Sequence, residues 1–301
     1  MKRKIDINKI LIPLDFSETS KVALEHGANL CAKFNADLHL LHVFTPMSSD
    51  VFPMLDVASQ IQEVKQSARK ELEKLSKDFA DQYGVKVSIE LRDGNPTKEI
   101  VKVAKEVEAD MIVMGTHGAS GIEEFFLGSN AYRVVTSASV PVFTIQKHAT
   151  KYGYQRIALP IDSSIHTRDK VSEAVYMAKH FGATIHIAAL ITEEHEDEKS
   201  KFNLKVKQIE EHLENQGISY LTTEKHGDNI AEMTMEHAKE VDADLIMIMT
   251  EQEAATGLFV GPYAQQIVNH SKIPVISVTP YETVTSFGRD QLAGDYRPFY
   301  I

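Results

Sequence analysis

The stretch MIVMGTHGASGIEEFFLGSN, residues 111–130, guides the interpretation of the whole chain. It opens with a short apolar run at 111–114, which predicts a buried strand. Glycines follow at positions 115, 118 and 121, and Gly128 and Ser129 then stand directly before a helical pattern at 131–137. A strand, a glycine loop and a helix start together favour anion binding, because glycines allow close backbone approach and a helix N-terminus offers unpaired N–H groups.

The spacing of these glycines is specific. Two residues separate Gly115 from Gly118, and nine separate Gly118 from Gly128. No Gly-Lys-Ser/Thr follows, so the stretch is not a P-loop, and it is not the dinucleotide pattern G-x-G-x-x-G. Ser129 would either cap the helix or donate its hydroxyl to a phosphate oxygen. The plain alternative is a strand-to-helix crossover in which the glycines serve only the turns.

Length and composition narrow the class of protein. The chain has 301 residues, which suggests about two domains of roughly 150 residues. A net charge of −11 disfavours binding to nucleic acid or to an anionic membrane. The single cysteine, Cys31, excludes an intramolecular disulfide and a cysteine-based zinc cluster. No signal-peptide pattern and no apolar run of about 18 residues is present, so we expect a soluble, cytoplasmic protein.

Strand-like and helix-like segments alternate through the first half. Such alternation implies an α/β fold, with a parallel sheet covered by helices on both faces. The expected strands are 9–14, 37–43, 85–91, 111–114 and 140–145, and the expected helices are one that starts near Ser17, 55–82, 95–107 and 131–137.

The second half repeats the first, which is the strongest indication of domain organisation. The repeated segments are KILIPLD (9–15) as RIALPID (156–162), FNADLH (34–39) as FGATIH (181–186), DGNPTKEI (93–100) as HGDNIAEM (226–233), EADMIV (108–113) as DADLIM (242–247) and VPVF (140–143) as IPVI (273–276). A polar stretch at 146–155 separates the halves. We therefore predict domains at 1–150 and 151–282 and a tail at 283–301, which we expect to dock on this chain or on a partner.

With this repeat and the G-x2-G-x9-G-S spacing, the chain resembles a tandem member of the universal stress protein family over everything but the tail. The resemblance implies two five-stranded parallel open sheets in the order 3-2-1-4-5. Ligands of such sheets bind outside the carboxyl ends of the strands, where the strand order reverses. Asp15 and Gly115 end the two strands that meet there. The resemblance also implies that strands 140–145 and 273–278 pair within the chain as a pseudo-dimer, and we expect a further homodimer.

The resemblance places an adenine nucleotide in the first half. ATP is the expected ligand, with Mg²⁺ as a companion ion and ADP or AMP as alternatives. Asp15 would bond ribose or base, although it could instead cap a helix. The expected binding residues are Pro13, Asp15, Val43, Met114, Gly115, His117, Gly118, Gly128 and Ser129. No catalytic residue is predicted. No metal site is predicted either, because His39 and His42 lie three apart on a strand and therefore face opposite sides, where they cannot easily share one ion.

The second half departs from the glycine pattern. Met249 stands where the first half has Gly115, and Pro262 stands where it has Ser129. Glu251 and Glu253 add negative charge beside the expected phosphate path. We therefore predict that the second half has no such nucleotide site.

Two classes of function compete. The family resemblance favours a stress-response regulatory protein that binds a nucleotide and acts on an unidentified protein partner. Efficient catalysis is not expected, since no lysine or arginine occurs in the glycine stretch before Arg133 and phosphoryl transfer needs charge neutralisation. The alternatives are a slow ATP hydrolase and an interaction module that binds no nucleotide.

Overall fold

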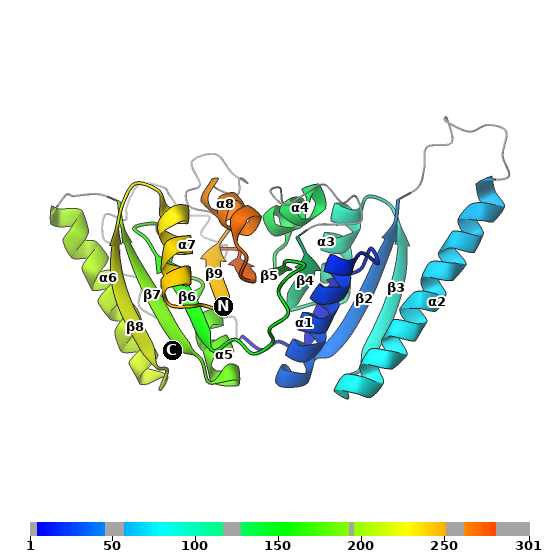
Figure 1. The fold of residues 1–301 in the computed structure, drawn as a ribbon, viewed down its shortest axis with the longest axis horizontal. Helices are drawn as coiled ribbons and strands as arrows, with labels where there is room; N and C mark the ends of the chain where they lie inside the picture. Colours follow the sequence, from blue (N-terminus) through cyan, green and yellow to red (C-terminus); the bar gives the residue numbers. More distant parts are fainter. Residues whose placement is uncertain (1–4, 46–56, 117–127, 193–195, 251–261, 281–301) are drawn as a thin grey trace, which may run out of the picture.

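The computed structural model describes residues 5–45, 57–116, 128–192, 196–250 and 262–280 (Figure 1). The first half contains β1 (Lys9–Pro13), α1 (Glu18–Phe34), β2 (Asp37–Phe44), α2 (Val57–Tyr83), β3 (Val87–Asp93), α3 (Pro96–Glu106), β4 (Met111–Gly115), α4 (Ser129–Ser137) and β5 (Val142–Ile145). The second half contains β6 (Arg156–Ile161), α5 (Val171–Phe181), β7 (Thr184–Ile191), α6 (Glu196–Asn215), β8 (Tyr220–His226), α7 (Ile230–Glu240), β9 (Leu245–Met249), α8 (Pro262–His270) and β10 (Val275–Val278).

The strands of both halves form one ten-stranded sheet in the order β3-β2-β1-β4-β5-β10-β9-β6-β7-β8. Each half has the predicted order 3-2-1-4-5, with parallel neighbours. The halves join where β5 pairs with β10 in antiparallel fashion, with Phe143 opposite Ile276. The predicted pairing of the fifth strands is therefore confirmed, and it makes the two predicted sheets continuous (Figure 1).

Helices cover both faces of this sheet. Successive strand residues point to opposite faces, so Ile10 and Ile12 pack under α1 and α2 while Leu11 packs under α3 and α4. The first of these faces carries one hydrophobic core that runs through both halves and includes α5 and α6. On the other face, α7 and α8 cover a separate cluster in the second half. Figure 1 shows α4 and α8 beside the middle of the sheet and α2 and α6 at its outer ends.

Local sequence explains where the helices begin and end. Ser17 caps α1 by accepting from the Ser20 N–H at 3.2 Å, and Asn35 ends α1 in the left-handed conformation with φ 57°. Asn95 caps α3, and Pro96 fills the first helical position, where the missing N–H costs nothing. The prediction that Ser129 could cap α4 is wrong, because Gly128 holds the capping position and no side chain bonds there.

The linker between the halves packs against α1. Nε2 of the buried His26 lies 2.6 Å from the carbonyl oxygen of Ala149, so it carries a proton and donates it to that bond. Burial lowers the pKa of His26, which favours the neutral ring, and in that ring Nδ1 accepts from the Tyr154 hydroxyl at 2.6 Å. The Tyr154 ring in turn packs on Phe143 of the first half and Phe181 of the second. The linker therefore belongs to the shared core.

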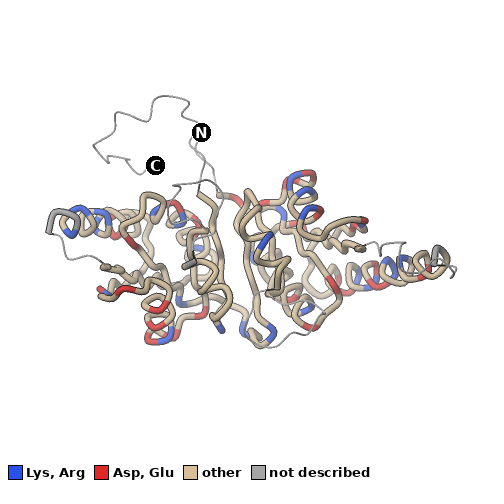
Figure 2. Tube along the Cα trace, turned by 90° about the horizontal axis from the view of Figure 1, so that it is seen from above, with Lys and Arg blue, Asp and Glu red and all other residues tan. Residues whose placement is uncertain are grey.

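Surface charge is of both signs. Figure 2 shows lysine and arginine next to aspartate and glutamate along the outermost helices. None of the helices in the described ranges is both long and apolar enough to cross a bilayer. The domain limits remain a prediction, and the tail at 283–301 lies outside the described residues.

Candidate functional site

A cavity of about 310 Å³ lies at the carboxyl ends of β1 and β4. These strands are neighbours in the sheet although β2 and β3 come between them along the chain, so the cavity lies where the strand order reverses. Open α/β sheets bind their ligands at this point. Among the described residues, the lining consists of Pro13, Leu14, Asp15, Ser20, Leu41, Val43, Pro96, Ile100, Met114, Gly115, Thr116, Gly128, Ser129, Asn130 and Ala131.

The structure brings together every expected site residue that it describes. Pro13, Asp15, Val43, Met114, Gly115, Gly128 and Ser129 all line this one cavity. His117 and Gly118 lie outside the described residues.

Several lining residues were missed by the sequence analysis. Pro96 and Ile100 come from α3, whose first turn borders the cavity. The rule that helix N-termini lie beside the carboxyl ends of parallel strands could have found them. Leu41 lies two positions before Val43 on β2, and therefore on the same face. Strand alternation could have found this residue as well.

Asp15 contributes a carboxylate at the rim of the cavity. Its Oδ1 accepts from the backbone N–H of Ser17 at 3.0 Å and from the Ser17 hydroxyl at 2.6 Å. Ser17, and not Asp15, caps α1, so the alternative role proposed for Asp15 is wrong. These two bonds fix the direction of the exposed Asp15 side chain.

The residue after Asp15 has an uncommon backbone conformation. Phe16 has φ 63°, in the left-handed region that non-glycine residues rarely adopt. Its ring lies 4.7 Å from that of His42, whose Nδ1 is 2.6 Å from the carbonyl oxygen of Leu14 and donates to it. Because β2 holds His42, it also supports the turn that carries Asp15.

Gly115 is required by packing, whether or not a ligand is present. A Cβ at this position would lie 2.8 Å from Cγ2 of Thr19 and 3.1 Å from the Thr19 carbonyl carbon. Contacts under 3.0 Å are closer than real Cβ atoms make, and here the neighbour includes helix backbone. The glycine thus lets α1 approach β4 at the cavity wall.

The N-terminus of α4 borders the same cavity. The N–H of Gly128 donates to the Thr116 carbonyl at 2.8 Å, which holds the helix start near the end of β4. No side chain in the described part of the chain caps this helix, and Ser129 is exposed at its first position. Asn130 accepts from the Thr97 hydroxyl at 3.3 Å. The first N–H groups of α4, with the positive end of the helix dipole, are therefore available to an anion.

The cavity is mostly apolar and carries one ionisable side chain among its described lining residues, that of Asp15. No lysine or arginine belongs to that described lining. In the described ranges, no three histidine, cysteine, aspartate or glutamate side chains come together as metal ligands would.

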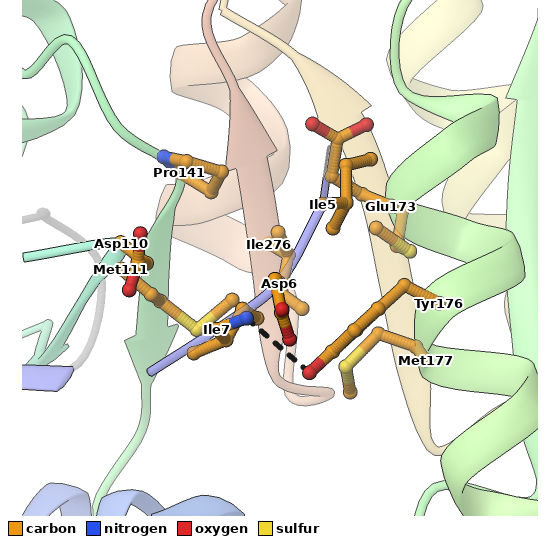
Figure 3. A pocket seen from close by; sticks show the side chains of 11 residues that line it. Ile5, Asp6, Ile7, Asp110, Met111, Pro141, Glu173, Tyr176, Met177 and Ile276 are labelled. Carbon is orange, nitrogen blue, oxygen red and sulfur yellow. Dashed lines mark hydrogen bonds between the residues drawn. The ribbon is translucent and has the colours of Figure 1, made fainter. Parts of the chain in front are cut away.

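A second, much smaller cavity lies between the halves (Figure 3). It has a volume of about 20 Å³ and is lined by residues 5–7, Met111, Tyr176 and Ile276, among others. The N–H of Ile7 donates to the Tyr176 hydroxyl across it at 3.3 Å. A volume of this size holds about one water molecule, so this cavity is not a ligand site.

The fold and the larger cavity define a doubly wound α/β protein with a pocket at the switch point. The model of the universal stress protein family matches residues 6–146 and 153–279, and the chain therefore belongs to that family, once in each half.

Known relatives agree with this assignment. Universal stress protein MJ0531 of Methanocaldococcus jannaschii is 36% identical over 144 residues, which are 46% of this chain and 82% of the relative. Universal stress protein MJ0577 of the same organism is 32% identical over 154 residues, 46% of this chain and 94% of the relative. A crystal structure of a universal stress protein from Archaeoglobus fulgidus, 21% identical, covers 90% of this chain and 98% of its own with a TM-score of 0.74, which supports the fold alone.

Proposed function

We propose that the first half binds an adenine nucleotide in the cavity between β1 and β4, and that the chain is a stress-response regulatory protein rather than an efficient enzyme. The observation that carries this proposal is the convergence of the motif residues on one cavity at the switch point. Its volume, about 310 Å³, lies at the lower end of the range for small-molecule pockets.

The lining suggests how the parts of the ligand would be held. Leu41, Val43, Ile100 and Met114 offer an apolar surface for a flat base. The carboxylate of Asp15 would accept a hydrogen bond from a ribose hydroxyl or from the base.

Phosphates would leave the cavity toward the start of α4. The Ser129 hydroxyl and the first N–H groups of that helix would bind them, as helix N-termini commonly do. The glycine-loop residues His117 and Gly118, which lie outside the described residues, would extend this path. ATP is the first choice of ligand, with ADP and AMP next, and Mg²⁺ would accompany the triphosphate.

Efficient hydrolysis is not proposed, because the described lining offers no cationic side chain to neutralise charge at a γ-phosphate. A slow hydrolase is the second candidate. A regulatory protein would act through a protein partner and as a homodimer in the cytoplasm; these statements rest on the family resemblance and on no residue of the site.

Calorimetry with ATP, and mass spectrometry of nucleotide released from the denatured protein, test the proposal. We expect about one nucleotide per chain, since one half carries the motif. Ser129→Glu places a carboxylate at the phosphate end and should abolish ATP binding. Ser139→Glu makes the same change at an exposed serine beyond the other end of α4 and should leave binding intact.

Each other result has a clear meaning. ADP that accumulates from added ATP would favour the slow hydrolase. If the wild-type chain neither retains nor takes up nucleotide, the proposal is wrong and the interaction module is favoured.

A further inference from the structure

The second half has its own switch point, at the carboxyl ends of β6 and β9. Asp162 follows β6 there, as Asp15 follows β1. Met249 ends β9 and pairs with β10, just as Gly115 ends β4 and pairs with β5. Neither of the two cavities described above includes a residue from this place.

Tyr263 lies where the first half has its cavity. It is the second residue of α8, as Asn130 is the second residue of α4. The Tyr263 hydroxyl is 3.3 Å from the hydroxyl of Thr234, the fifth residue of α7. The fifth residue of α3 is Ile100, and both Ile100 and Asn130 line the first-half cavity. The tyrosine thus spans the two helices between which the cavity of the first half opens.

The Tyr263 side chain is also enclosed. Its exposed fraction is 8%, whereas Asn130 is exposed to solvent. Burial raises the pKa of the Tyr263 phenol, and the nearby carboxylate of Asp162 acts in the same direction. The Asp162 carboxylate, which is also buried, therefore lies within electrostatic range of the phenol.

Lys170 supplies a cation at the same place. It is 3% exposed, and its Nζ donates to the carbonyl and the hydroxyl of Thr167 at 2.8 and 3.3 Å. Burial lowers the pKa of Lys170 to about 8, and the charge of Asp162 opposes that change. Asp162 is itself buried, whereas Asp15 is exposed. The backbone N–H of Asp162 donates to the same Thr167 hydroxyl at 3.0 Å, so the second half holds its aspartate near an internal ammonium group.

Met249 stands at the position of the glycine that α1 approaches in the first half. Helix α1 begins at Glu18, directly after its aspartate turn, and passes over Gly115. Helix α5 begins only at Val171, and residues 165–170 form turns instead. A methionine at the end of β9 leaves no space for a first turn placed as in α1. The turn segment that ends at Lys170 stands in place of that first turn, and the Lys170 side chain is buried.

We propose that the second half retains a nucleoside-sized site of the same design and that Tyr263 and Lys170 fill it from within the chain. This goes beyond the function proposed for the first half. The nucleoside class rests on that function, whereas the filling by the two side chains does not.

The first arm of the test creates a cavity at the switch point of the second half. Tyr263→Ala removes the phenol ring, and added phenol is the probe. We expect the variant to melt at a lower temperature than the wild type and to bind about one phenol per chain, as apolar cavities made by substitution do, with its melting temperature rising accordingly. Tyr263→Phe keeps the ring, and Tyr220→Ala removes a partly exposed ring from β8, so neither should respond to phenol.

The other arm closes the first half. Asn130→Tyr combined with Ile100→Thr copies the second-half pair into the first cavity, and ATP affinity should fall about tenfold or more, a loss of roughly 1.4 kcal/mol for each factor of ten. Ser137→Tyr is the control: it adds the same ring to the exposed last residue of α4, outside the cavity lining, and should keep the affinity.

The outcomes separate this inference from the proposed function. The claim that Tyr263 fills the second-half site is wrong if phenol does not bind to Tyr263→Ala, or if a crystal structure of that variant places the phenol away from β6 and β9. This holds even when the first half binds ATP. If the wild type binds no nucleotide while Tyr263→Ala binds phenol as expected, the proposed function of the first half is wrong. The inference that Tyr263 fills the second-half site is then still supported. Unchanged ATP affinity in the Asn130→Tyr, Ile100→Thr variant would overturn the common design of the two sites.

Discussion

Thr19 on α1 lies so close to Gly115 at the end of β4 that a Cβ on the glycine would be 2.8 Å from the threonine Cγ2. The contact involves helix backbone as well as side chain, and Gly115 also lines the candidate nucleotide cavity. Glycine at this position is therefore both a packing residue and a lining residue, and the two roles can be separated by experiment.

Gly115→Ala should destabilise the protein by about 1–3 kcal/mol, the usual range for overpacking, because α1 must move away from β4. Denaturant unfolding measures the effect. Gly227→Ala is the matched control, since the nearest atom to its Cβ is the flexible Met233 sulfur at 3.3 Å. Equal stability of Gly115→Ala and wild type would show that α1 can move away from β4 without a loss of unfolding free energy.

Asp15→Asn should weaken nucleotide binding while the fold is kept. The amide oxygen can still accept from Ser17, but the charge that strengthens a bond to a ribose hydroxyl is lost. Hydrogen bonds to charged groups contribute about 1.5–3 kcal/mol, which corresponds to roughly tenfold to hundredfold in affinity. Calorimetry checks this, with Asp37→Asn at the opposite end of the sheet as control. An unchanged dissociation constant would remove Asp15 from the site.

Phe143→Ala should destabilise both halves together. Phe143 is fully buried on β5, where the halves join, and its core runs through both. Large aromatic truncations in cores cost about 3–5 kcal/mol. We expect one lowered unfolding transition in calorimetry. Phe79→Ala, in a buried position of the outer helix α2, is the comparison. A variant whose halves melt separately would contradict the shared core.

His237→Val should make stability less dependent on pH. His237 is 1% exposed on α7, and burial lowers its pKa below the value of about 6.5 for an unfolded chain. The unfolded chain then binds a proton that the folded chain does not, so stability is present above pH 6.5 and is lost as pH falls below it. One proton corresponds to about 1.4 kcal/mol per pH unit.

Valine is the residue of the first half at this position, Val103, which is also buried. Unfolding free energies of His237→Val measured between pH 5 and pH 7 should therefore show a shallower slope than those of the wild type. The same slope in both proteins would show that His237 does not contribute to the pH dependence of stability.

Much of the fold follows from the sequence because the signals are local or repeated. The alternation of apolar strands and amphipathic helices predicts the parallel sheet, and the VPVF and IPVI repeats predict the strands that join the halves. The late start of α5 could not be predicted from its own residues, since Met249, which replaces the glycine that α1 approaches in the first half, stands in a distant strand.

The residues of the candidate site also fall into those that the local sequence reveals and those that only the fold brings together. Gly115, Gly128 and Ser129 lie within one motif, so their spacing revealed them. Ile100 belongs to a separate helix and joins the cavity only through the packing of α3 on the sheet. Tyr263 posed a harder problem, because an aromatic residue at the second position of a helix can face solvent or core, and only the fold decides between them.

The antiparallel pairing of β5 with β10 has a consequence for how this protein can change over generations. In a symmetric homodimer, each substitution appears on both sides of the interface at once. Here the two sides are encoded separately, and the linker keeps them together at every protein concentration. A substitution can therefore alter one half while its counterpart stays as it was, so Asn130 and Tyr263 can occupy matching positions in a single molecule.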